Sequence, residues 1–308
     1  MVTLPSAWEL ASLVCKILGY FGAASIVGGS LCLWLYNDGS RKNLTSILKY
    51  IAIGTFFGFQ GSLLYFLIQV GMVVDKGFAG MFDLDMSSIF LETQLGDTTV
   101  FRLGGFVLSF VVSLFYLHKL SSFNRPPGQF FFRFLTTSNF IAFLLIVFSF
   151  RFSGHISVLG SVAKVSIALH FLAFAAWIGS LYPLYRLTYS ESIDLVQSGM
   201  KTFGQHAIVI VLMLILAGVS MLFELFNSFN EIIDTPYGQA LVLKLILVLF
   251  IFAVAALNKI KFSPGLVDRD SIMRLRHSIR IEIMVAILIL CVTSYFSTIV
   301  GPVSHQMS

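Results

Sequence analysis

Charged side chains are scarce in this sequence of 308 residues. Asp, Glu, Lys and Arg make up 11% of it, whereas hydrophobic residues make up 57%. An ordinary soluble domain carries roughly 25% charged residues, so this composition excludes a soluble globular protein. It also gives no signature of nucleic-acid binding, because the excess of basic residues is spread over the short connections between apolar segments.

Cysteine is rare, and nucleotide-binding motifs are absent. Cys15, Cys32 and Cys291 are isolated in apolar segments and form no C-x-x-C pair, so the sequence implies no disulfide framework. It contains no G-x-x-x-x-G-K-[ST] motif, which excludes this mode of ATP binding. The N-terminus lacks a basic region and an A-x-A cleavage site, so we expect the first apolar segment to be a retained helix.

Long apolar segments dominate what is present. A membrane-spanning helix needs about 20 mostly apolar residues. Eight segments meet or nearly meet this length, and we place them at residues 8–36, 44–74, 98–118, 134–150, 163–187, 206–227, 237–258 and 279–300. We therefore predict an all-α integral membrane protein, a bundle of about eight transmembrane helices in lipid. It would form one transmembrane domain over residues 1–308, with a short outside tail at 301–308.

The connections between these segments alternate in charge. Acidic residues fill residues 75–97 and follow the sixth segment, at Glu224, Glu231 and Asp234. Basic residues gather in the other connections, at Arg41, Lys42, Lys119, Arg125, Arg133, Arg186, Lys201, Lys259, Lys261, Arg269, Arg274, Arg276 and Arg280. Because short loops rich in Lys and Arg stay in the cytoplasm, both termini are expected outside, which is the periplasmic side of a bacterial inner membrane.

Some ionisable residues lie within the apolar segments. A charge at the centre of a membrane costs at least about 2.5–3.5 kcal/mol on insertion scales, so Lys244 needs a partner. Glu224 is expected at a similar depth, and the pair predicts either a structural ion pair between the sixth and seventh segments or a transport role. Glu282 is a third intramembrane charge. Thr235 followed by Pro236 predicts the start of a helix.

Potential metal ligands gather on the outer half of the predicted bundle. Imidazole and thioether groups suit Cu(I) and Cu(II), although Met is more often a gap-filler and a buried His is often an interhelical hydrogen-bonding group. His170 is about two turns inside its segment, which is deep for an idle solvated residue. The candidate metal ligands are His155, His170, His305, Met72, Met81, Met86 and Met221. No catalytic residue is assigned.

Several blocks of residues resemble a known family. They are Gly154-His155, Leu169-His170-Phe171-Leu172-Ala173, Ala176-Trp177-Ile178-Gly179-Ser180-Leu181 with Pro183, Thr235-Pro236-Tyr237-Gly238, Leu243-Lys244, Ala255-Ala256-Leu257-Asn258-Lys259, and Leu275-Arg276 with Glu282. In this order they resemble the motifs of the copper resistance protein D (CopD) family. The resemblance runs from 154 to 300, whereas residues 1–153 match only in helix number and length. The chain departs from the family at Ile167, where an acidic residue is frequent, and at Gln239 and Lys259, which replace arginines.

The resemblance, rather than composition, implies a role in copper homeostasis at the inner membrane. Our first hypothesis is a protein that takes copper from the periplasm, beside a periplasmic copper carrier of the CopC type, and moves it across the membrane. The second is a membrane redox enzyme that acts on copper and holds haem b between His155 and His170, since two histidines can ligate haem. The third is a membrane receptor for the copper carrier that transports nothing.

Overall fold

The computed structural model describes residues 5–35, 41–122, 128–152, 160–225 and 229–300, and within these ranges every regular element is a helix. Eight helices are long and apolar enough to cross a membrane, which confirms the predicted all-α membrane fold. Their main parts are α1 (Ala7–Leu35), α2 (Arg41–Val74), α4 (Gln94–Ser122), α5 (Gln129–Phe148), α6 (Ser161–Leu187), α7 (Ile193–Leu225), α9 (Pro236–Leu257) and α10 (Arg269–Tyr295).

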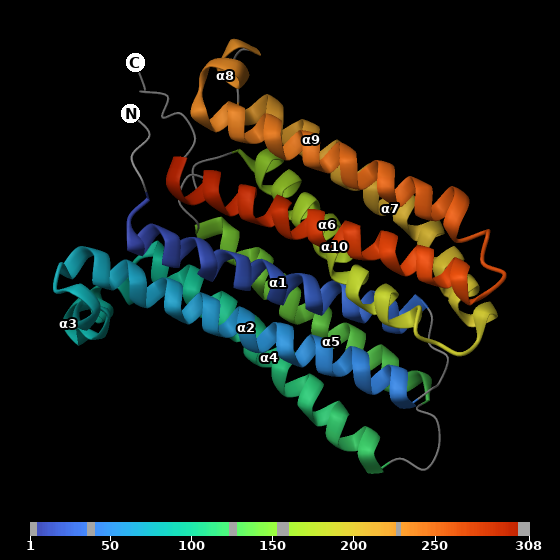
Figure 1. Ribbon diagram of the computed structural model, residues 1–308. Coiled ribbons are helices and arrows are strands. Elements are labelled where there is room, and N and C mark those ends of the chain that lie inside the picture. Colours follow the sequence, from blue (N-terminus) through green and yellow to red (C-terminus); the bar gives the residue numbers. More distant parts are fainter. Residues whose placement is uncertain (1–4, 36–40, 123–127, 153–159, 226–228, 301–308) are drawn as a thin grey trace.

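Short helices extend or connect these spans. The 3-10 helices are η1 (Gly77–Phe82) and η2 (Ser149–Phe152), the short α-helices are α3 (Leu84–Leu91) and α8 (Phe229–Asp234), and the π-helices are η4 (Asn258–Phe262) and η5 (Phe296–Val300). Figure 1 shows the long helices running side by side, with α3, α8 and the start of α1 at one end of the bundle. We call it the α3–α8 end. The connections from α6 to α7 and from α9 to α10 lie at the opposite end.

Two helices begin well before their predicted starts. α7 begins at Ile193 and α10 at Arg269, whereas the apolar segments begin at 206 and 279. Hydropathy marks only the part of a helix that lies in hydrocarbon, and the helix continues as long as its backbone hydrogen bonds are satisfied. Asp268 caps the added turns of α10 by accepting a hydrogen bond of 2.8 Å from the Ser271 N–H, and this bond lowers the pKa of Asp268.

The start of α9 is as predicted from the sequence. Thr235 is the N-cap, with its Oγ1 accepting a hydrogen bond of 3.0 Å from the Gly238 N–H, and Pro236 is the first helical residue. This position suits proline, whose missing N–H would have had no helical partner there.

The backbones of α1 and α6 approach each other closely at two glycines. A Cβ at Gly179 would lie 1.8 Å from the Ala24 carbonyl oxygen, and a Cβ at Gly28 would lie 2.0 Å from the Gly179 carbonyl carbon. Tyr50 of α2 donates its hydroxyl to the Gly179 carbonyl oxygen at 3.0 Å. Ser180 donates to the Gly28 carbonyl oxygen at 3.4 Å. Small residues let helix backbones approach closely in membranes, and here they allow α1 and α6 to touch.

Other glycines of α1 face different neighbours. A Cβ at Gly22 would meet Gly58 of α2, and a Cβ at Gly29 would meet Ile51 of the same helix. At Gly19, nothing lies within 4 Å of the position that a Cβ would take, and this residue borders a small cavity instead. The glycines of α1 therefore do not all meet the same neighbour.

A polar network ties α1 to α4 and α5. Ser109 donates its hydroxyl to Asn139 Oδ1 at 2.8 Å, and Asn139 Nδ2 donates to Ser30 Oγ at 2.8 Å. All three side chains are buried. Interhelical hydrogen bonds of this kind stabilise membrane bundles modestly, by about 0.6–2 kcal/mol each, and they fix the relative rotation of the helices.

Arginines of α10 hold the connection between α6 and α7 at the opposite end. Arg276 donates from Nη2 to the Thr188 carbonyl oxygen at 2.7 Å, and its guanidinium lies 3.7 Å from the centroid of the Tyr189 ring. Arg280 donates to the Tyr185 hydroxyl at 3.0 Å. The basic residues that predict orientation therefore also make specific packing contacts.

We expect Gly179→Ala to destabilise the protein, because the new methyl group would overlap the Ala24 carbonyl and force α1 and α6 apart. Overpacking typically costs about 1–3 kcal/mol. The measurement is thermal unfolding of the purified protein in detergent. Gly104→Ala is the matched control, because nothing lies within 4 Å of a Cβ at Gly104; equal melting temperatures for the two variants would contradict the close contact.

Candidate functional site

His170 lies between α6 and α7 with its ring in a defined orientation. The imidazole is partly buried, and its Nδ1 lies 3.2 Å from the Leu214 carbonyl oxygen of α7. A carbonyl oxygen only accepts hydrogen bonds, so Nδ1 carries the hydrogen and Nε2 keeps the lone pair. Histidines that bind metals usually donate their other ring N–H to such a partner. His170 therefore presents one nitrogen that is able to coordinate.

A glycine on α7 makes room for this ring. A Cβ at Gly218 would lie 3.3 Å from His170 Cε1 and 3.4 Å from Nδ1. Met221 follows Gly218 by about one helical turn and is partly buried, so it shares the α7 face that packs toward α6. Of the predicted thioether ligands, Met221 is the one on the helix that contacts His170.

Lys244 of α9 and Glu224 of α7 are two of the predicted intramembrane charges. The Lys244 ammonium lies 5.6 Å from the centroid of the Phe296 ring. Glu224 is exposed near the end of α7, and these two described residues form no salt bridge. The predicted ion pair is wrong, because Lys244 turns toward an aromatic face while Glu224 faces the surroundings.

Glu282, the third predicted intramembrane charge, has a partner that the sequence did not indicate. It is buried on α10, and Asn258 Nδ2 donates a hydrogen bond to its Oε1. Asn258 begins the π-helix η4, and its Oδ1 is buried without a hydrogen-bond partner among the described residues. Two of the blocks that resemble the family are thus joined directly, between α9 and α10.

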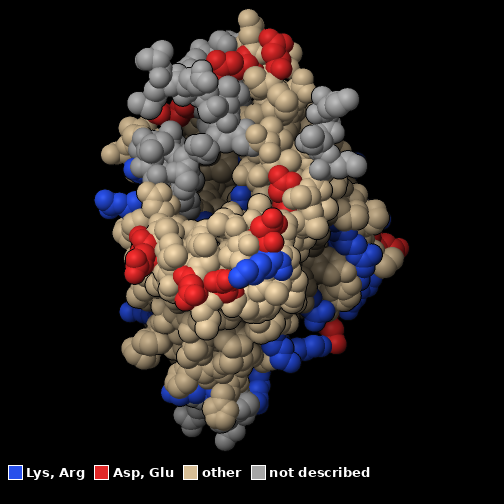
Figure 2. Space-filling view, turned by 90° about the vertical axis from the view of Figure 1, so that its left-hand side faces the viewer, with Lys and Arg blue, Asp and Glu red and all other residues tan. Residues whose placement is uncertain are grey.

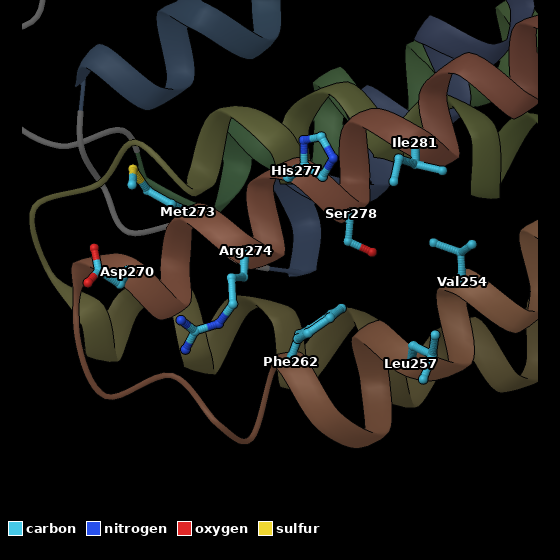
Figure 3. Close-up of a pocket in the computed structure, with 9 residues that line it drawn as sticks. All are labelled: Val254, Leu257, Phe262, Asp270, Met273, Arg274, His277, Ser278 and Ile281. Carbon is cyan, nitrogen blue, oxygen red and sulfur yellow. The ribbon is translucent and has the colours of Figure 1, made fainter.

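A pocket lies beside this pair, at the opposite end of the bundle (Figure 3). Its volume is about 630 Å³. Leu257 and Phe262 of α9 and η4 form an apolar wall, and Arg274 and His277 of α10 line it as well. The sequence indicates His277 only as a residue of the basic end, and no signal marks it as part of a pocket.

The predicted methionine ligands from the first helices do not gather around His170. Met81 is buried in a hydrophobic cluster with Cys15 and Ile68. Met72 is exposed near the end of α2, and Met86 donates its backbone N–H to Asp83 Oδ1 at 3.0 Å as part of the α3 cap. The Met81 side chain therefore serves in packing, and the α3 cap uses only the backbone N–H of Met86.

Two predicted histidine ligands, His155 and His305, lie outside the described residues. Across the described part of the chain, no three or more His, Cys, Asp or Glu side chains come together in a group that could hold a metal ion. A copper site here would therefore combine His170 with thioether, backbone or undescribed ligands.

The α3–α8 end carries a further feature that sequence reasoning missed. Figure 2 views this end, whose surface is hollowed near the middle, with Lys or Arg atoms visible inside the hollow. A cavity of about 60 Å³ lies among α1, α2, α4, α5, η2 and α6, and Lys16 and Arg102 both line it. In the sequence, the only indication of this feature is that two basic residues lie in apolar segments. Nothing in the sequence shows that the two residues lie close together.

Comparison with known proteins identifies one family. The family model described as copper resistance protein D matches residues 198–296, and no curated protein or solved structure matches significantly. The matched segment covers most of α7 and all of α9 and α10. It includes Lys244, Asn258 and Glu282 and begins after His170. In residues 198–296, therefore, this chain of membrane-spanning helices is similar to the copper resistance protein D family.

Proposed function

We propose that this protein moves copper ions from the periplasm across the bacterial inner membrane. The family match supports a copper resistance membrane protein, and transport is the step that we add. The bundle would place its α3–α8 end in the periplasm and its opposite end, with Arg269, Arg276 and Arg280, in the cytoplasm. This orientation follows the rule that basic residues remain on the cytoplasmic side.

One observation carries the proposal: the fixed tautomer of His170. The hydrogen bond from Nδ1 to the Leu214 carbonyl leaves Nε2 as the coordinating atom. The residue lies in the half of α6 nearer the α3–α8 end, where a periplasmic ion would arrive. Met221 adds a soft sulfur donor on the neighbouring helix, and thioether ligands favour Cu(I). A few weak ligands suit transport, because an ion that is held too tightly cannot leave.

The segment from η1 to α3 is the surface that we assign to a periplasmic copper carrier of the CopC type. It exposes the large apolar side chains of Phe78, Phe82 and Leu84. Asp83 and Asp85 add negative charge, and the hydrogen bond from the Met86 N–H lowers the pKa of Asp83, which keeps it ionised. Acidic groups of this kind attract cations and basic partners.

The two alternatives remain distinct from transport. A haem-containing redox protein would need a second imidazole to pair with His170, and the sequence candidate, His155, lies outside the described residues. A Soret band in the absorption spectrum of the purified protein would favour that function. A receptor that only binds the carrier would keep its affinity for the carrier when His170 and His155 are both replaced by alanine.

We expect His170→Ala to reduce copper uptake into proteoliposomes to the background of empty vesicles, because the oriented Nε2 ligand is lost. His206→Ala is the control. His206 contacts the Thr202 carbonyl of its own helix and packs edge-on against Trp34, so its loss should leave uptake close to wild type. Wild-type uptake no faster than background would refute transport, and undiminished uptake by His170→Ala would refute this ligand.

We expect Gly218→Leu to weaken copper binding by roughly tenfold or more, which is the usual cost of losing a group that orients a ligand. The new side chain would occupy the space of the imidazole and break its bond to Leu214. Val219→Leu is the control, because Val219 is the next residue on α7 and its side chain is exposed. The measurement is competition with a copper chelator in detergent, with melting temperatures recorded to confirm folding; equal affinities for the two variants would argue against the oriented site.

A further inference from the structure

Three arginines gather around a pair of tyrosines at the opposite end of the bundle. The hydroxyl groups of Tyr185, in α6, and Tyr189, in the α6–α7 connection, lie 2.8 Å apart. Arg280 of α10 donates from Nε to the Tyr185 hydroxyl at 3.0 Å. The guanidinium groups of Arg276 and Arg186 lie 3.7 Å and 5.5 Å from the centroid of the Tyr189 ring. These five side chains form one cluster, which we call the arginine–tyrosine cluster.

The positive charges of this cluster contact neutral groups. Arg276 donates to the hydroxyl and to the carbonyl oxygen of Thr188, at 3.0 Å and 2.7 Å, so the protein itself uses its hydrogen bonds. Arg186 and Arg280 are exposed. In the part of the chain that the structure describes, none of the three arginines forms a salt bridge. Like charges gathered in this way repel one another, whereas a phosphate between the exposed guanidinium groups would accept charge-assisted hydrogen bonds from them.

The cluster lies where the apolar segments of two helices end. Arg280 is at the start of the apolar part of α10, so it is expected at the boundary between hydrocarbon and headgroups. Tyrosine is enriched at this boundary, because its ring is apolar and its hydroxyl is polar. Beyond Arg280, the side chains of Met284, Ile287 and Leu288 are exposed, and their spacing places them on the same face of α10 as Arg280. An exposed apolar stripe therefore leads from the cluster into the membrane.

From this arrangement we infer that the arginine–tyrosine cluster binds the headgroup of an anionic phospholipid. Arg186 and Arg280 donate to its phosphate, and an acyl chain lies along the apolar stripe of α10. Basic groups between membrane helices bind anionic headgroups in this way. A free phosphate would meet the same arginines but would leave the stripe unmatched, so the continuity of cations and apolar surface favours a lipid. The bound lipid links α10 to α6, and it needs neither His170 nor copper.

The test measures the melting temperature of the full-length protein in detergent as phosphatidylglycerol or phosphatidylcholine is added at constant ionic strength. Both lipids carry a phosphate, but only phosphatidylglycerol has a net negative charge. A ligand that binds the folded state raises its stability in a saturable, concentration-dependent way. We expect a larger rise with phosphatidylglycerol for the wild type and loss of most of this difference in the double variant Arg186→Gln/Arg280→Gln. Arg274→Gln is the control, because Arg274 is exposed on α10 but lies outside the cluster.

Three results would overturn the inference: equal effects of the two lipids on the wild type, an undiminished difference in the double variant, or an equal rise with soluble glycerol phosphate, which has no acyl chain. If the double variant does not fold, Arg280→Lys replaces it, because lysine keeps the charge but cannot bind a phosphate through two parallel hydrogen bonds. Native mass spectrometry then decides: weaker retention of phosphatidylglycerol than in the wild type supports the site, and equal retention rejects it. These measurements contain no copper, so their outcome is independent of transport.

Discussion

The close contact between the backbones of α1 and α6 at Gly28 and Gly179 is the constraint on which the rest of the bundle depends. Neither glycine could carry a Cβ without overlapping the other helix. Tyr50 and Ser180 then donate hydrogen bonds across the same crossing. Because lipid is as apolar as a helix surface, close packing and hydrogen bonds, rather than the hydrophobic effect, hold membrane helices together.

The crossing sets the position of α6, and α6 carries the candidate ligand. His170 lies on this helix before Gly179, toward the α3–α8 end, and its ring reaches α7 only because Gly218 leaves room for it. Farther along α6, Trp177 stacks on Phe252 of α9 with ring centroids 5.0 Å apart. One helix thus connects the first part of the chain, the candidate copper ligand and the segment that matches the family.

The charged side chains within the spans are contacted mostly by neutral groups. Lys244 lies over an aromatic ring, Lys16 bonds to a carbonyl, and Glu282 accepts from Asn258. Carbonyls, amides and aromatic faces can be supplied by the apolar bundle itself, whereas a carboxylate partner would add a second charge to desolvate. At the opposite end, where headgroups and water are near, the arginines of α10 clamp the α6–α7 connection directly.

The sequence by itself determined the membrane class, the eight spans and the cap at Thr235, because long apolar runs and cap residues act locally and require no knowledge of neighbouring helices. It also located His170 and the family motifs. Only the tertiary structure decided that Asn258 meets Glu282, that Lys244 does not meet Glu224, that Met81 is packing, and that Lys16 and Arg102 share a cavity. Such pairings depend on the rotation and crossing of helices distant in sequence, and hydrophobic periodicity in a lipid environment leaves both undetermined.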